Sequence, residues 1–226
     1  MDRINSVPGT QGHMELFYHS PRRAPPRAGC NDYPRFVEVR RGLRPAAVFR
    51  YLDEFYSRPG TIGFKLMYPH IRQYPEILLY LLMHRVSVIH LVRNNHLDVI
   101  LSEHLANKSG RFHAVREEDY EQKEVISLDP ATVAESVRWL DRKQRMVRAM
   151  LRALPVPVHE VSYESLCHDN SAFISVCDFI GIAGEREDRE KSHLVKTQRS
   201  PHSRVISNYQ EIRAALALAG YQHLLQ

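Results

Sequence analysis

The sequence has few cysteines and no long apolar segment. Its three cysteines, Cys30, Cys167 and Cys177, form no CxxC pair, which argues against a disulfide scaffold and against a zinc site. The longest apolar run, residues 77–83, is far shorter than the ~20 residues that a membrane span needs. The first dozen residues also lack the apolar segment of a signal peptide. These absences predict a cytoplasmic protein without a membrane span.

Positive charge is in excess but is not concentrated. The formal net charge is +5, yet the chain contains no run of five like charges. Its aromatic residues do not alternate with lysines, as they do in proteins that bind single-stranded nucleic acid. Nucleic acid, anionic lipid and a phosphorylated small molecule are all compatible with the charge. We expect a compact anionic ligand and no nucleic acid, while an ordinary basic surface explains the charge equally well.

Short strand-like runs alternate with helical patterns along the chain. Apolar residues recurring at helical spacing, and the capping residues beside them, predict where the helices lie. Strands are expected at 61–67, 86–92 and 155–163, and helices at 44–56, 75–83, 129–154, 170–181 and 208–218. A further helix is expected after the strand at 86–92, with Asn94 and Asn95 as candidate caps and Gly110 as its stop. Asp129 and Asn170 are the expected N-caps of their helices, and Gly220 is expected to stop the last one. The segment 8–12 contains two glycines but follows no strand, so a turn is expected there. Even the first predicted strand therefore follows a helix.

This alternation predicts one α/β domain over residues 1–226, with a mostly parallel sheet. Such sheets bind ligands beyond the carboxyl ends of their strands. Arg93 follows the strand VSVIHLV, and Ser102 lies nine residues later on the next predicted helix. A guanidinium and a hydroxyl suit a phosphate. The simpler alternative is a surface arginine paired with Asp98 or Glu103, and a serine that the helix tolerates.

Five segments together resemble the sulfotransferases that use 3′-phosphoadenosine 5′-phosphosulfate (PAPS), in the bacterial branch that includes trehalose sulfotransferase. They occur in the same order as in that family and cover nearly the whole chain. These segments are GHMELFYH (12–19), GFKLMYPH (63–70), the Arg93 to Ser102 stretch, VSYESL (161–166) and the C-terminal stretch that begins LVKTQRSPHSRVISNYQ (194–210). The resemblance implies a three-layer αβα, P-loop-like fold.

The resemblance also assigns roles to individual residues. It implies that Arg93 and Ser102 bind the 3′-phosphate of PAPS and that Tyr163 stacks on adenine. Glu15 would be the base that takes the acceptor proton, with His13 and His19 as alternatives because histidine titrates nearest neutrality. Lys65 and His19 would bind the acceptor, and Lys196 and Arg199 would close on the cofactor. For each of them an ordinary structural or surface role remains the alternative.

One part of the family pattern has no counterpart in the chain. Sulfotransferases hold the 5′-phosphosulfate in a loop rich in Gly, Ser and Thr between the first strand and the first helix, where backbone N–H groups bind the anion. We expect the chain to begin just past that loop, as an N-terminally truncated form of the fold. The alternative is a non-catalytic sulfotransferase-like remnant that acts as a binding or interaction module.

The acceptor and the oligomeric state are the least constrained predictions. The acceptor would be a hydroxyl of a sugar, a lipid or a small metabolite, and a homodimer is compatible with the sequence. The histidines have no HExxH or comparable metal spacing, so no metal is expected. A P-loop kinase is disfavoured, because no GxxxxGK[ST] motif occurs and no acidic pair is placed to hold Mg²⁺.

Overall fold

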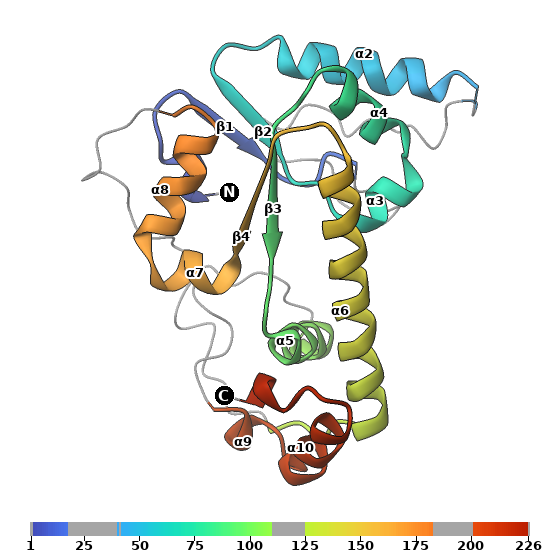
Figure 1. Cartoon of the computed structure of the whole chain (residues 1–226), viewed down its shortest axis with the longest axis vertical. Coiled ribbons are helices and arrows are strands. Elements are labelled where there is room, and N and C mark those ends of the chain that lie inside the picture. The colour runs from blue at the N-terminus through green and yellow to red at the C-terminus, as the bar shows by residue number, and fades with distance from the viewer. Residues whose placement is uncertain (1, 18–39, 41, 110–124, 183–200, 226) are drawn as a thin grey trace. The chain divides into compact units, whose positions relative to one another are not determined.

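The computed structural model describes residues 2–17, 40, 42–109, 125–182 and 201–225. Two compact units divide the chain (Figure 1). The first unit comprises Met1–Ile89, Leu154–His159 and Phe173–Lys191, and the second comprises His90–Ala153, Glu160–Ala172 and Ser192–Gln226. Helices and small parallel sheets make up both, so the chain is of mixed α/β class. The prediction of a single domain stays a prediction.

The first unit is built around a two-stranded parallel sheet. Strand β1 (Thr10–His13) pairs with β2 (Thr61–Phe64), with Thr10 opposite Thr61 and His13 opposite Phe64. Around this pair the unit contains α1 (Asp2–Asn5), α2 (Arg44–Tyr56), α3 (Tyr68–Gln73), α4 (Glu76–Met83) and most of α8 (Asn170–Phe179).

The expected turn over residues 8–12 is wrong, because Thr10–His13 forms β1. The turn lies earlier, where Gly9 adopts a φ of +78°. TQGH lacks the apolar alternation of a strand, so only pairing with β2 makes it extended. Gly60 allows the two strands to start together: a Cβ on this residue would lie 2.5 Å from the carbonyl oxygen of Gly9.

The core of the first unit lies under α2 and α4. The predicted stripe of α2 is confirmed, since Val48, Leu52 and Phe55 are buried on one side of this helix. Tyr74 and Ile77 are also fully buried in this cluster. Because each large side chain removed from water contributes roughly 1.5–3 kcal/mol, this cluster is the main source of stability for the first unit.

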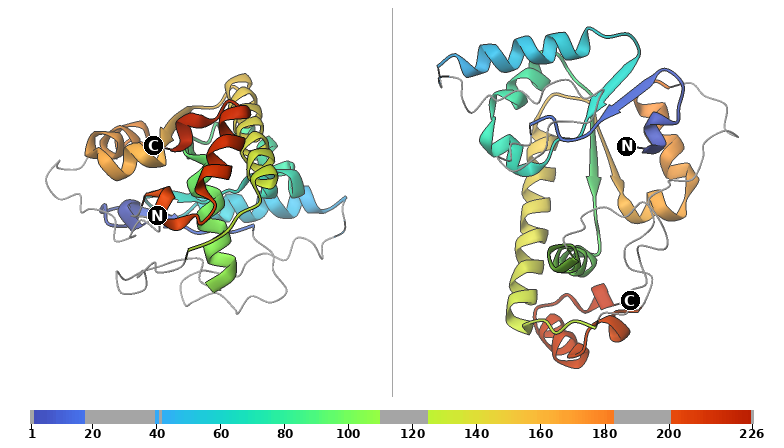
Figure 2. Two further views of the ribbon diagram at one scale, coloured as in Figure 1. Left: turned by 90° about the horizontal axis from the view of Figure 1, so that it is seen from below. Right: turned by 180° about the vertical axis from the view of Figure 1, so that it is seen from behind.

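The second unit packs short helices against one long helix. The long helix is α6 (Pro130–Ala153), and it contacts α5 (His96–Ser109) and α10 (Tyr209–Leu218), as Figure 2 shows. Short elements complete the unit: α7 (Tyr163–His168), α9 (His202–Val205) and the 3₁₀ helix η3 (Gln222–Leu225). Its core joins Leu97 and Leu101 of α5 to Val137 of α6 and to Ile212 and Leu216 of α10.

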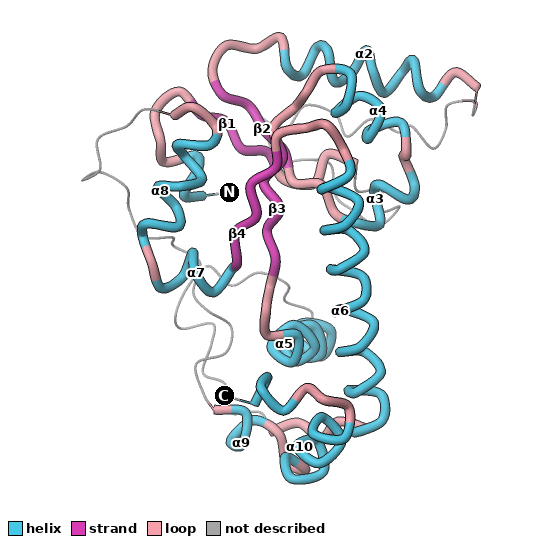
Figure 3. Tube along the Cα trace, in the orientation of Figure 1, coloured by secondary structure: helices cyan, strands magenta, loops and turns pink. Residues whose placement is uncertain are grey.

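Strands β3 (Val88–Val92) and β4 (Val158–Ser162) form the other parallel sheet, drawn in magenta in Figure 3. The first two residues of each strand are assigned to the first unit and the last three to the second. In the second unit, His90 Nδ1 lies 3.0 Å from Glu160 Oε2. Arg148 of α6 donates three hydrogen bonds to the same carboxylate, two from Nε and one from Nη2. The Arg148 hydrogen bonds are the main reason that the pKa of Glu160 is lowered. This network fixes α6 to the sheet.

Several predicted boundaries are corrected by cap geometry. Pro75 is the N-cap of α4 and not its first residue, and α3, which has Pro69 in its first turn, was not predicted. Asp169, not Asn170, caps α8, because its carboxylate accepts the N–H of Ser171 at 2.7 Å. Tyr163 is the first residue of α7, directly after β4. Asp129 caps α6 and Gly220 follows α10 as predicted.

None of the helices within the described residues is long and apolar enough to cross a membrane. Of the two cysteines in this part of the chain, Cys167 is exposed and Cys177 is buried.

Two leucines on α10 provide a test of the second core. Leu216 is fully buried, whereas Leu218, two residues later, is 91% exposed. We expect Leu216→Ala to lower the free energy of unfolding by about 2–5 kcal/mol, because it leaves a cavity. Leu218→Ala should change it by less than about 0.5 kcal/mol. Urea unfolding followed by circular dichroism measures both, and similar losses would contradict the packing of α10.

Candidate functional site

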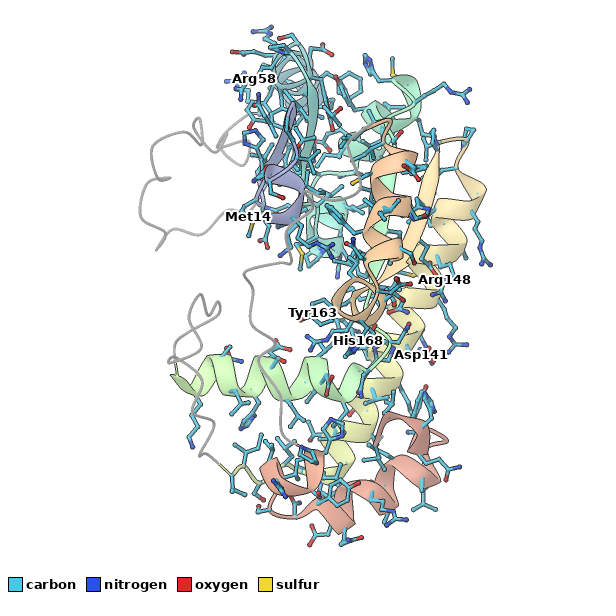
Figure 4. All side chains as sticks on the ribbon, turned by 90° about the vertical axis from the view of Figure 1, so that its left-hand side faces the viewer. Met14, Arg58, Asp141, Arg148, Tyr163 and His168 are labelled. Atoms are coloured by element: carbon cyan, nitrogen blue, oxygen red, sulfur yellow. The ribbon has the colours of Figure 1, made fainter. Side chains whose placement is uncertain are left out.

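The ends of β3 and β4 bring Arg93 and Tyr163 together. Each residue directly follows its strand, and the carboxyl ends of adjacent parallel strands lie at the same edge of a sheet. The guanidinium carbon of Arg93 lies 4.8 Å from the centre of the Tyr163 ring, within the range of a cation–π interaction. Figure 4 shows Tyr163 at the start of α7. The predicted pair of site residues is therefore assembled by the sheet.

Arg93 and Ser102 each carry a buried polar atom without a hydrogen-bond partner. These atoms are Nε of Arg93 and Oγ of Ser102, and the statement concerns the described residues alone. Leaving such groups unpaired costs ~1–3 kcal/mol each, so proteins rarely keep them without a reason. The two atoms are a hydrogen-bond donor of a cation and a hydroxyl, and both suit an anion.

One part of the simpler alternative, an ion pair of Arg93 with Asp98 or Glu103, is not found among the described residues. Asp98 is instead buried beside His202 of α9, whose Nε2 lies 2.8 Å from Asp98 Oδ1. His202 was not singled out from the sequence, because nothing in its surroundings indicates a partner 104 residues away.

Glu164 holds the loop between β3 and α5 in place. Its carboxylate accepts the backbone N–H groups of Asn94 at 3.0 Å and Asn95 at 3.1 Å. The side chain of Asn95 in turn accepts the N–H of Asp98 at 3.2 Å and so caps α5, as predicted. Glu164 thereby fixes the backbone next to Arg93. The sequence placed this glutamate within VSYESL but gave no sign of its contact with the loop.

The Tyr163 hydroxyl stays protonated at neutral pH. Burial raises the pKa of Tyr163 to about 12, and a hydrogen bond with Cys167 adds to this effect. The charge of Arg93 acts in the opposite direction and the charge of Asp98 in the same direction. Tyr163 therefore offers a neutral aromatic face and no negative charge to an anion near Arg93.

The ends of β1 and β2 bring together a different group of predicted residues in the first unit. Lys65 follows β2, and its Nζ lies 2.8 Å from Oε1 of Glu15, which lies just past β1. The Lys65 side chain is 37% exposed, so its charge is neither fully buried nor unpaired. His70 is buried nearby, and this burial is the main reason that its pKa is lowered. The charge of Glu15 acts to raise the pKa of His70, and the charge of Lys65 acts to lower it. His70 was not predicted as a site residue.

His13 ends β1 with its ring enclosed. The ring packs edge-on against Phe55 at 5.1 Å, and its Nε2 is buried with no hydrogen-bond partner in the described residues. Burial and then the charge of Arg58 lower the pKa of His13, so the imidazole is neutral at pH 7. A neutral ring can accept a proton, but an enclosed Nε2 does not meet an acceptor directly. The roles predicted for Glu15 and His13 stay predictions.

Three predicted residues lie outside the described part of the chain: His19, Lys196 and Arg199. Their roles stay predictions. The described residues contain no group of three or more His, Cys, Asp or Glu side chains that could hold a metal ion.

Comparison with other proteins does not identify the chain. No family model matches it, and no curated protein or solved structure is significantly similar to it. A functional proposal therefore depends on the chemistry of two groups of residues: Arg93, Ser102 and Tyr163 beside β3 and β4, and Glu15 and Lys65 beside β1 and β2.

The unpaired hydroxyl of Ser102 leads to a stability prediction. Ser102→Ala removes a buried group without a partner, so the free energy of unfolding should rise by about 1 kcal/mol, beyond the few tenths that Ala adds in a helix. Ser136→Ala on α6 is the control and should show the helix contribution alone. Denaturant unfolding without ligand measures both. A less stable Ser102→Ala protein would mean that the hydroxyl has a partner in solution.

Proposed function

We propose that the chain is a PAPS-dependent sulfotransferase of the three-layer αβα, P-loop-like type. The observation that carries the proposal is the Arg93–Tyr163 pair at the ends of β3 and β4, where Nε of Arg93 is buried without a partner. A cation beside an aromatic ring is what a phosphorylated nucleoside requires, because the phosphate needs charge and the base needs a stacking surface. The unpaired Ser102 hydroxyl adds a donor on the adjoining helix.

In this proposal each residue of the group beside β3 and β4 has a distinct part in binding the cofactor. Arg93 pairs with the 3′-phosphate, and Ser102 donates a hydrogen bond to it. Tyr163 stacks on adenine with the ring face opposite the guanidinium. Glu164 positions Arg93 through the N–H groups of Asn94 and Asn95. Since these contacts are made before any ligand binds, little ordering is needed on binding.

The first-unit group would serve the acceptor. When bound, PAPS supplies the sulfuryl group, which is transferred to the acceptor oxygen with release of adenosine 3′,5′-bisphosphate. Glu15 takes the proton that the acceptor hydroxyl loses, and Lys65, 2.8 Å away, keeps its carboxylate oriented. The acceptor is a hydroxyl of a sugar, a lipid or a small metabolite. We place the reaction in the cytoplasm, where the exposed thiol of Cys167 stays reduced.

The first test is nucleotide binding. A charge-assisted hydrogen bond is worth ~1.5–3 kcal/mol, so Arg93→Ala should weaken the binding of adenosine 3′,5′-bisphosphate by roughly ten- to a hundredfold. Adenosine 5′-monophosphate lacks the 3′-phosphate, and its affinity should hardly change. Isothermal titration calorimetry measures both ligands. Equal losses would assign Arg93 to the fold and not to the phosphate.

The second test concerns the base. In the full-length protein, Glu15→Gln should lower turnover by ~10²–10⁴-fold, while the affinity for adenosine 3′,5′-bisphosphate stays the same, because Glu15 faces the acceptor. Transfer of radiolabelled sulfate from PAPS to a panel of hydroxyl acceptors measures turnover. Turnover within a few-fold of the parent would remove Glu15 from this role in favour of His13 or His19. Nucleotide binding without any turnover would favour a non-catalytic binding module.

A further inference from the structure

Helix α6 exposes a face that is divided into a cationic half and an apolar half. Its opposite side is buried through Val137, Val147 and Leu151. On a helix, residues three, four and seven apart lie on one side. The exposed positions on this side include four arginines, Arg138, Arg142, Arg145 and Arg152, beside them Trp139 and Met146, and the acid Glu135.

The two apolar side chains of this face are unusually exposed. Trp139 is 56% exposed and Met146 is 64% exposed, although tryptophan is highly buried on average. Lys143 lies on the same helix with Nζ 4.2 Å from the Trp139 ring centre, so a cation already contacts one side of the indole. Large exposed apolar side chains beside charged ones are typical of interaction surfaces.

The positive charge of the face is largely free of internal partners. Arg138, Arg142 and Arg152 form no ion pair within the described residues, and Arg145 pairs with Asp141 at 3.0 Å. Arg148, labelled with Asp141 on α6 in Figure 4, differs from them because Glu160 neutralises it. The described chain therefore leaves a row of guanidinium groups on α6 for an external anion.

We propose that the exposed face of α6 binds an anionic lipid surface. Trp139 and Met146 enter the headgroup region, where tryptophan is favoured. The arginines extend their stems along the same face and pair with lipid phosphates and carboxylates. Each arginine near such a surface strengthens binding by about fivefold, so the row gives a reversible attachment without any membrane span.

Other occupants fit the face less well. A second copy of the chain would place arginine against arginine. A protein partner would need a continuous apolar centre, but Trp139 and Met146 are two side chains with Arg142 on one side of them and Lys143 against the Trp139 ring. The phosphates of nucleic acid would pair with the arginines, but they have no apolar surface against which Met146 could be buried. A lipid surface satisfies both halves of the face, because its charged and apolar layers lie next to each other.

The proposal stands apart from the sulfotransferase function. None of the residues of the α6 face belongs to the Arg93 or Glu15 groups. A protein that does not bind nucleotide could therefore still bind lipid through α6, and a protein that does not bind lipid could still bind nucleotide. The chain itself provides the probe, since Trp139 is its single tryptophan. Its fluorescence reports on this face alone.

The test is to titrate the full chain with vesicles of phosphatidylcholine alone and with an equal mixture of phosphatidylcholine and phosphatidylserine. We expect the Trp139 emission to shift to the blue with the mixed vesicles only, and about 1 M salt to abolish the shift, since it shortens the screening length to ~3 Å. Arg142→Glu should weaken binding at least about tenfold, because it removes one positive charge and adds a negative one.

The matched control is Arg50→Glu, the same charge change at an exposed position of α2, which should leave binding within about twofold, as the arginine is not on the α6 face. Circular dichroism verifies that both variants fold. An equal blue shift with neutral vesicles, or equal losses for the two variants, would overturn the proposal. A shift produced by short duplex DNA at lower concentration than by the mixed vesicles would assign the face to nucleic acid instead.

Discussion

Parallel strand pairing is the constraint on which the rest of the structure depends. Two parallel strands end at the same edge, so the residue that follows one strand meets the residue that follows its neighbour. The pair β1–β2 brings Glu15 to Lys65 in this way, and the pair β3–β4 brings Arg93 to Tyr163. Among the described residues each sheet has two strands, and each creates one group of polar side chains. Elsewhere the chain mainly supports these two edges with helices.

In the group beside β3 and β4, hydrogen bonds hold the backbone in place while two buried polar side-chain atoms lack partners in the described chain. Glu164 and Asn95 satisfy the backbone around the start of α5, and the buried Asp98–His202 pair fixes α9 to the same helix. Arg93 Nε and Ser102 Oγ, in contrast, are left without partners in the described chain. Carrying unpaired groups costs stability, and a ligand that satisfies them recovers it. Such a pattern is what a preformed binding site requires.

Helix α6 serves three purposes with three of its faces. Val137, Val147 and Leu151 build the second core, and Arg148 fixes the helix to the sheet through Glu160. The remaining face bears the arginines beside Trp139. Because helical periodicity separates these faces, a change on one need not disturb the others. A mutation on the exposed face can therefore alter binding to a surface without altering the site beside Arg93.

The sequence by itself determined the α/β class, the helix α2 with its buried stripe, the cap of α6 at Asp129 and the position of Arg93 at a strand end. Each of these depends on local spacing or on one capping residue, which the sequence displays directly. Tertiary structure alone decided that TQGH is a strand, that Asp98 pairs with His202 and that Glu164 holds the start of α5. These contacts join residues far apart in the chain or override weak local preference. No periodic pattern encodes them, because the energy that fixes them comes from the partner segment.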